Sequence, residues 1–172
     1  METFFAEIYK LIFRLKPLAL FYIIVCGFVI HEFDSYLTWK HRTDPFTDDT
    51  DQYYSYLPNV FIHHDLNYNQ QGRYWLQDLP NGNKFQRFTC GVAVMEAPFF
   101  FAGHFYAKAQ GYKIDGYSAP YVWSNYFGIF FYVMVALFFL YKSLRFYFSE
   151  WVSIFVLTAV FMATNLFFYT LS

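Results

Sequence analysis

The sequence predicts an all-α membrane protein with about three transmembrane helices and a large external loop that carries juxtamembrane and interfacial helices. The chain has 172 residues, of which 57% are hydrophobic, 27% aromatic and only 15% charged. Soluble domains contain about 25% charged residues, and one soluble core of this length could not bury so many aromatic rings. The formal net charge of -1 argues against a nucleic-acid partner, because phosphate binding requires an excess of Lys and Arg.

Three apolar runs are long enough to cross a bilayer, namely Leu11–Ile30, Tyr121–Tyr141 and Trp151–Leu171. About 20 apolar residues in a helix span the ~30 Å hydrocarbon core. No small-residue cleavage site follows the first run, which favours an uncleaved helix over a signal peptide. The predicted division is a cytoplasmic N-terminus and first helix (1–31), an external loop (32–119), a second helix (120–142), a cytoplasmic turn (143–150) and a third helix (151–172).

A fourth run, Cys90–Ala107, is apolar but contains Glu96, Pro98, Gly103 and His104. A carboxylate in the middle of a bilayer costs several kcal/mol, and a proline removes a helix hydrogen bond. On a helix Glu96, Gly103 and His104 share one face. One interpretation is a helix near 90–107 that lies in the interface with its polar face outward. The other is a transmembrane helix whose polar face is turned to a protein cavity.

Basic residues favour the interfacial interpretation. Lys10, Arg14 and Lys16 place the N-terminus in the cytoplasm by the positive-inside rule. The turn between the second and third helices contains Lys142 and Arg145 and is also predicted to be cytoplasmic. Both assignments hold when the run at 90–107 does not cross the bilayer. The whole segment 32–119 is then external.

The densest polar cluster lies near the start of the external loop and contains Asp44, Asp48, Asp49 and Asp51. Carboxylates this close repel one another, which raises the pKa of one unless a cation or a donor compensates. Such a cluster suits a general base or a hard-metal site. The structural alternative is a helix start, in which Asp49 is the N-cap and Gln52 occupies the N3 position of a capping box.

Two cations, Lys84 and Arg87, precede the interfacial run, and the Asn81-Gly82 pair before them is a turn signal. Cations at the height of the headgroups suit a phosphate group, and Arg supplies a bidentate fork. General attraction to anionic lipid is an equally good explanation.

Several other ionisable residues are secondary candidates. The run His63, His64, Asp65 has the ligand types of a zinc site, but adjacent histidines point in different directions and no second pair completes the site. Asp65 of this run is a secondary candidate for a functional role. Glu96 and His104, from the run at 90–107, are the other two.

Four segments carry a resemblance to a known family: DTDQYYSYLPNVFIHHDLNY, NGNKFQRFTCGVAVMEAPFFFAGH, DGYSAPYVW and TNLFFYTL. Together with the topology, they resemble bacterial members of the GT-C superfamily of membrane glycosyltransferases. This superfamily includes the lipid A aminoarabinose transferases and the protein O-mannosyltransferases. The resemblance implies a multi-pass protein of the bacterial inner (cytoplasmic) membrane. It also implies transfer of a sugar from a polyprenyl-phosphate donor to a glycan, lipid or protein acceptor on the external, periplasmic face.

The resemblance also implies site residues. The family's acidic position before paired aromatics corresponds to Asp51, ahead of Tyr53 and Tyr54, as the base or acceptor-orienting group. The adjacent family position is Thr50 here, and Asp49 is the next carboxylate. A divalent cation, Mg or Mn, would use Asp49 and Asp51 as ligands.

The basic family position corresponds to Lys84, with Arg87 beside it, and these residues would hold the donor phosphate together with Tyr53 and Tyr54. Family members have many more helices than three, so the chain is expected to be the N-terminal part of a longer enzyme and inactive alone. Two alternatives remain: a non-catalytic membrane subunit or scaffold, and a transporter fragment that uses Glu96 and His104 as intramembrane ionisable groups.

Overall fold

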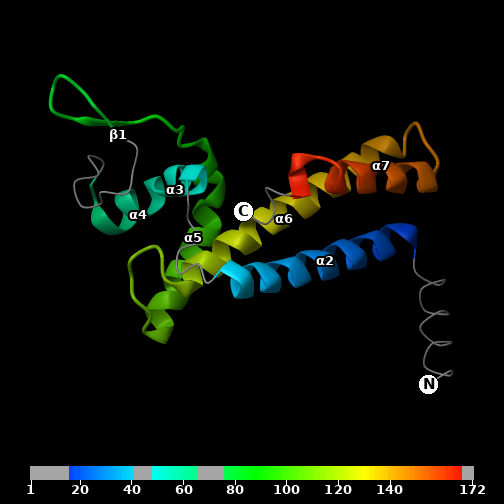
Figure 1. Ribbon diagram of the computed structural model, residues 1–172, viewed down its shortest axis with the longest axis horizontal. Coiled ribbons are helices and arrows are strands. Elements are labelled where there is room, and N and C mark those ends of the chain that lie inside the picture. The colour runs from blue at the N-terminus through cyan, green and yellow to red at the C-terminus, as the bar shows by residue number, and fades with distance from the viewer. Residues whose placement is uncertain (1–15, 41–47, 66–75, 168–172) are drawn as a thin grey trace. The chain divides into compact units, whose positions relative to one another are not determined.

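The computed structural model of the protein describes residues 16–40, 48–65 and 76–167, and these residues are mostly helical (Figure 1). The chain divides into two compact units. The first comprises residues 1–42 and 133–171, and the second comprises residues 43–132 together with Ser172. The long helix α6, Ala119–Leu144, contributes its N-terminal part to the second unit and its C-terminal part to the first.

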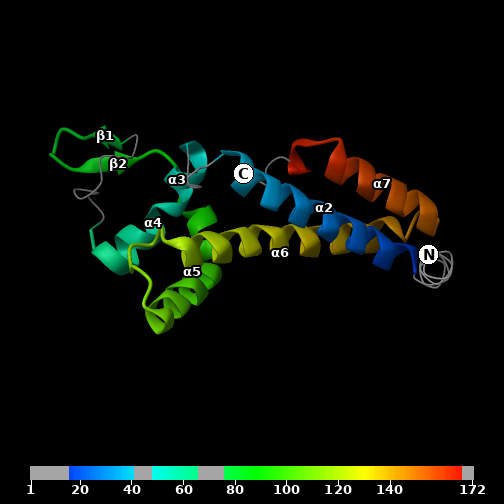
Figure 2. The same cartoon turned by 60° about the horizontal axis from the view of Figure 1, so that its bottom comes forward.

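In the first unit, α2 (Pro17–Lys40) packs against α7 (Glu150–Met162). Figures 1 and 2 show the two helices side by side. The contact is apolar because α2 repeats buried residues every four positions, at Phe21, Val25 and Val29, which places them on one face. The Tyr22 hydroxyl also donates a hydrogen bond to the Met134 carbonyl of α6, at 3.1 Å.

Among the described residues, α6 alone is long and apolar enough to cross a membrane. It has 26 residues and contains the whole predicted run Tyr121–Tyr141. The expectation of about three transmembrane helices is therefore not confirmed. The apolar part of α2 is the shorter stretch Pro17–His31, and residues 11–15 of the predicted first run lie outside the described residues. Instead of ending near residue 31, α2 continues to Lys40, because no proline interrupts it.

The third predicted run is helical with an interruption. The helix α7 has 13 residues and ends at Met162, residues 163–164 form a bend, residues 165–167 are helical again, and residues 168–171 lie outside the described residues. Near this end the Thr164 hydroxyl donates to the Val160 carbonyl at 2.6 Å and accepts from the Leu166 N–H at 3.2 Å. A threonine that bonds the backbone in this way competes with the regular helix ladder. At 1.5 Å per residue, α7 is about 20 Å long.

The second unit is built around α5 (Gly91–Gln110) and the N-terminal part of α6. Three short helices precede them: α3 (Asp48–Tyr54), α4 (Tyr56–Pro58) and the π-helix η1 (Asn59–His63). Their core is a cluster of aromatic and small side chains from all these helices except η1. Its buried members are Tyr54, Leu57, Ala93, Phe100, Ala107, Tyr121 and Val122.

A two-stranded hairpin is the one departure from an all-α fold within the described residues. Strands β1 (Leu76–Asp78) and β2 (Lys84–Gln86) pair antiparallel, with Leu76 opposite Gln86 (Figure 2). The Asn-Gly signal predicts this turn, and Gly82 adopts a φ of 81° that suits glycine. The strands themselves were not expected, because three residues are too few to show a period-two pattern.

The helix predicted near 90–107 exists as α5, but its orientation differs from the interfacial interpretation. Glu96 and Gly103 are buried against the protein together with Phe100, so the polar face does not point outward. Gly103 permits this contact with α6, because a Cβ atom there would lie 2.9 Å from the Pro120 carbonyl oxygen. The exposed side of α5 is instead apolar, with Val92, Val94, Met95, Phe105 and Tyr106.

The loop between α5 and α6 provides a test of the core. Gly116 has a φ of 81°, and a Cβ atom there would lie 2.6 Å from Pro58 Cβ. We expect Gly116→Ala to lower the free energy of unfolding by about 2–4 kcal/mol, because left-handed strain and overpacking add. Gly111→Ala is the matched control, since its φ is 72° but the added Cβ meets open space. Equal losses in thermal unfolding of the two variants would contradict the packing argument.

Candidate functional site

The acidic cluster forms the first turns of α3, and its two described carboxylates differ sharply in exposure. The helix begins at Asp48, so Asp49 lies inside the first turn and is not the predicted N-cap. Asp49 is exposed, whereas Asp51 is only 5% exposed. Asp44 lies outside the described residues. The structure therefore separates Asp51 from Asp49, although the two are close in sequence.

Asp51 is a carboxyl group with one oxygen available. The Tyr117 side chain forms a hydrogen bond with it, while its Oδ1 atom is buried and has no hydrogen-bond partner among the described residues. Burial raises the pKa of Asp51 to about 6, and the Tyr117 hydrogen bond only partly opposes this effect. A carboxylate that titrates near neutral pH is well suited to accept a proton from a substrate.

A group of buried polar side chains, which we call the amide cluster, follows Asp51 and consists of Gln52, Ser55, Asn59 and Gln86. The Gln86 amide nitrogen donates to Gln52 Oε1 at 3.0 Å, to the Gln52 carbonyl at 3.3 Å and to Ser55 Oγ at 3.4 Å. The Asn59 amide donates to the Ser55 carbonyl at 2.8 Å. Within the described part of the chain, Asn59 Oδ1 and Gln86 Oε1 are buried acceptors without a hydrogen-bond partner.

The amide cluster was not predicted from the sequence. Uncharged amides and hydroxyls are common on helix surfaces, so single residues of this kind carry little information. The available signal was spacing, because Gln52, Ser55 and Asn59 are three and four positions apart and therefore share one helical face. Gln86 comes from the hairpin, and no local pattern could have assigned it to that face.

Gln86 also determines where the predicted phosphate-binding cations lie. Lys84 and Gln86 occupy the same face of β2 because they are two positions apart, and Gln86 is held against α3. Arg87 follows the end of the strand. Both cations are exposed. The structure thus links the strand that contains Lys84 to the helix that contains Asp51. Arg87 is also held close to these helices, because the next residue, Phe88, accepts a hydrogen bond from the Tyr56 hydroxyl and packs on Tyr53.

The paired aromatics after Asp51 have separate roles. Tyr54 is fully buried, and its hydroxyl donates to the Gly116 carbonyl at 2.6 Å, so it belongs to the core and not to a binding surface. Tyr53 is half-buried and packs edge-to-face on Phe88, with ring centroids 4.8 Å apart. Of the two predicted binding tyrosines, only Tyr53 is open to a ligand.

The secondary candidates lie in different surroundings. Glu96 is 9% exposed, and its Oε2 atom has no hydrogen-bond partner within the described ranges. His104 Nδ1 lies 2.8 Å from the Tyr121 hydroxyl oxygen, and its ring stacks on Phe100. Asp65 is half-buried beyond the end of η1.

The described residues contain no group of three or more His, Cys, Asp or Glu side chains that could hold a metal ion. Asp49 and Asp51 differ in burial, so they do not form an evident two-carboxylate ligand pair. Binding of a divalent cation, Mg or Mn, remains a prediction.

Comparison of the chain with protein-family models, with curated proteins and with solved structures gave no match. The functional argument therefore depends on the site itself.

The buried Glu96 carboxyl predicts a pH-dependent stability. Burial raises the pKa of Glu96 from 4.5 to about 7. Between these values the folded state holds a proton that the unfolded state releases, so the free energy of unfolding falls as pH rises through this window. Glu96→Gln removes the charge. We expect it to raise the free energy of unfolding by about 3 kcal/mol at pH 8 and to leave it unchanged at pH 4.

Chemical unfolding of the protein in detergent at both pH values measures this effect. Asp78→Asn is the control, because Asp78 is an exposed carboxyl on the hairpin. An equal gain for Glu96→Gln at pH 4 and pH 8 would show that charge burial is not the cause.

Proposed function

We propose that the chain is the N-terminal part of an integral-membrane glycosyltransferase of the GT-C type in a bacterial inner membrane. It transfers a sugar from a polyprenyl-phosphate donor to an acceptor on the external face. The observation that supports this proposal most strongly is Asp51, which is buried and has one oxygen without a hydrogen-bond partner among the described residues, and whose pKa burial raises to about 6. A non-catalytic scaffold would have no need for such a carboxyl group, which costs free energy to bury.

The proposed chemistry assigns one role to Asp51 and another to Lys84. Asp51 accepts the proton of an acceptor hydroxyl while the oxygen forms a bond to the anomeric carbon of the sugar. The bond from that carbon to the donor phosphate breaks, and the phosphate leaves with the electron pair. Lys84 stabilises the negative charge that develops on the phosphate. The hydrogen bonds of Gln86 favour this pairing because they join the strand of Lys84 to α3.

The proposed topology places this site outside the cytoplasm. Helix α6 supplies one crossing by its length and composition. We propose that the apolar part of α2, together with the residues before it, and the segment that begins with α7 provide the other two. Lys16 then lies on the cytoplasmic side with Lys142 and Arg145, as the positive-inside rule requires.

Substitution of Asp51 tests the assigned base. In cells that lack the protein, mass spectrometry of envelope glycans, lipids and proteins should reveal a species short of one sugar. When the whole protein with Asp51→Asn is expressed in these cells, we expect the species that lacks the sugar to persist. Loss of a general base lowers the rate roughly 10²–10⁴-fold. Asp49→Asn is the matched control in the same helix and should restore the sugar. In membrane assays wild-type transfer should rise with pH through about 6, as Asp51 ionises.

Full restoration by Asp51→Asn, at normal protein abundance, would overturn the role of Asp51. If deletion of the protein changes no glycosylated species, the proposed function itself fails.

The two cations provide a second test. We expect Lys84→Gln to reduce sugar transfer at least tenfold, because about 1.4 kcal/mol of charge stabilisation of the leaving phosphate corresponds to that factor. Arg87→Gln should have a smaller effect, since Arg87 is one position after Gln86 and therefore does not share the face of the strand that carries Lys84 and Gln86. Initial rates in membranes that contain equal amounts of each variant measure the difference. A larger loss for Arg87→Gln would reverse the assignment of the phosphate-binding residue.

A further inference from the structure

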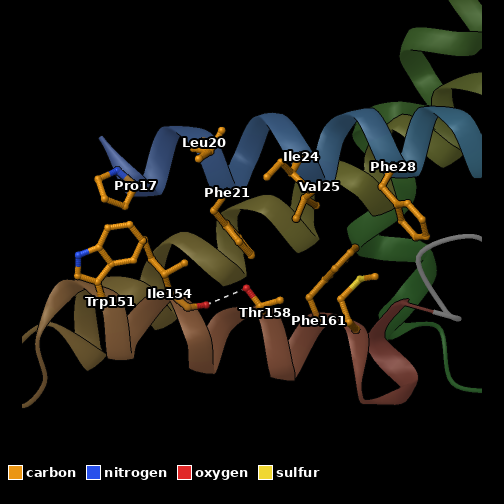
Figure 3. Close-up of a pocket in the computed structure, with 11 residues that line it drawn as sticks. Pro17, Leu20, Phe21, Ile24, Val25, Phe28, Trp151, Ile154, Thr158 and Phe161 are labelled. Carbon is orange, nitrogen blue, oxygen red and sulfur yellow. Dashed lines mark hydrogen bonds between the residues drawn. The ribbon is translucent and has the colours of Figure 1, made fainter. Parts of the chain in front are cut away.

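An apolar groove lies between α2 and α7 in the first unit (Figure 3). Its volume is about 250 Å³. Ile24, on the α2 side of the groove, is 61% exposed, so the groove is open along part of its length. The side chains that line it are apolar except Thr158.

Among the described residues, the polar side-chain groups of the lining are the Thr158 hydroxyl and the indole N–H of Trp151, which is at one end. The Thr158 hydroxyl donates to the Ile154 carbonyl at 2.9 Å within α7, so it is already bonded (Figure 3). An apolar surface of this kind favours apolar molecules over water. Because the groove is elongated between two helices, its natural occupant is a hydrocarbon chain.

One end of the groove is basic. Figure 3 shows Pro17 and Trp151 at the same end, opposite Phe28 and Phe161. Lys16 directly precedes Pro17, and the turn from α6 to α7 contains Arg145. Figures 1 and 2 both place this turn beside the N-terminal end of α2.

The charges at this end favour an anion. Arg145 and Lys142 are exposed, as is Lys16, and one Arg145 nitrogen donates to the Phe148 carbonyl at 2.7 Å. The carboxylate at this end among the described residues, Glu150, accepts a hydrogen bond from Tyr141 at 3.4 Å. By their positions in the chain, three cations and, among the described residues, one carboxylate therefore lie toward this end of the groove.

We propose that this groove binds one acyl chain of an anionic bilayer phospholipid, with the lipid phosphate at Lys16 and Arg145. The inference rests on the membrane location in the proposed function, but not on sugar transfer. The groove matches the chain because it is apolar, and its basic end matches the phosphate. Trp151, which is 71% exposed beside this end, has the amphipathic ring that is typical of the headgroup level.

Native mass spectrometry of the full chain in neutral detergent tests the proposal. The probes are dioleoylphosphatidylglycerol and dioleoylphosphatidylcholine, which have the same acyl chains and differ in headgroup charge. We expect about tenfold preferential retention of the anionic lipid, the factor that one charge-assisted contact provides. Lys16→Gln combined with Arg145→Gln should remove the preference. Lys108→Gln, at an exposed lysine of α5, should not.

A matched pair of substitutions tests the groove itself. Ile24 lines the groove, whereas Ile23, its neighbour with 56% exposure, does not. Ile24→Trp should reduce retention of the anionic lipid about tenfold by occupying the groove, and Ile23→Trp should leave it unchanged. Thermal unfolding of both variants checks that they fold.

Equal retention of the two lipids by the wild-type chain would overturn the headgroup assignment. Equal effects of the two tryptophan variants would overturn the groove assignment. Neither result bears on sugar transfer, which the envelope glycans report separately. If deletion of the protein changes no glycosylated species but the chain still prefers the anionic lipid, the proposed enzymatic function is wrong. The proposed lipid site would then be retained.

Discussion

The hydrogen bonds from the Gln86 amide to Gln52 and Ser55 hold the second unit in the form that its site requires. They attach a three-residue strand, too short to be stable alone, to a short helix that is equally dependent on its neighbours. The Tyr56 hydroxyl, which donates to the Phe88 carbonyl, adds a second link between the segment of Lys84 and the helices around Asp51. Gln52 Oε1 belongs to a buried side chain, so loss of its bond to Gln86 would leave an unsatisfied polar group and cost about 1–3 kcal/mol. The Gln52 carbonyl and the Ser55 hydroxyl would remain bonded to each other.

Ionisable side chains are buried in this unit at a cost that the aromatic packing must offset. Asp51 and Glu96 both have raised pKa values because burial disfavours their charged forms. Around them Phe100 contacts the rings of Tyr54 and Tyr121, at 6.0 and 5.4 Å between centroids. Groups with strongly shifted pKa values often mark functional sites, and here the two carboxyls lie on helices that pack against each other.

Helix α5 shows what periodicity alone can predict and what it cannot. Spacing correctly predicted a helix near 90–107 and placed Glu96 and Gly103 on one face. Spacing could not decide whether that face would point outward or pack against the protein, because an interfacial helix and a packed helix share the same period. The small Gly103 decided it by allowing close contact with α6. Similarly, composition predicted an apolar third run but not the bend at residues 163–164, where the Thr164 hydroxyl forms hydrogen bonds with the backbone.

The sequence by itself determined the helical character, the long apolar helix that became α6, the turn at Asn81-Gly82 and the acidic start of α3. These features depend on local propensity and on apolar run length, which a single segment contains. Only the tertiary structure decided that Asp51 is buried while Asp49 is exposed, that Tyr54 belongs to the core, and that Gln86 meets Gln52. Burial and pairing depend on residues far apart in the chain, and no local pattern specifies which of them meet.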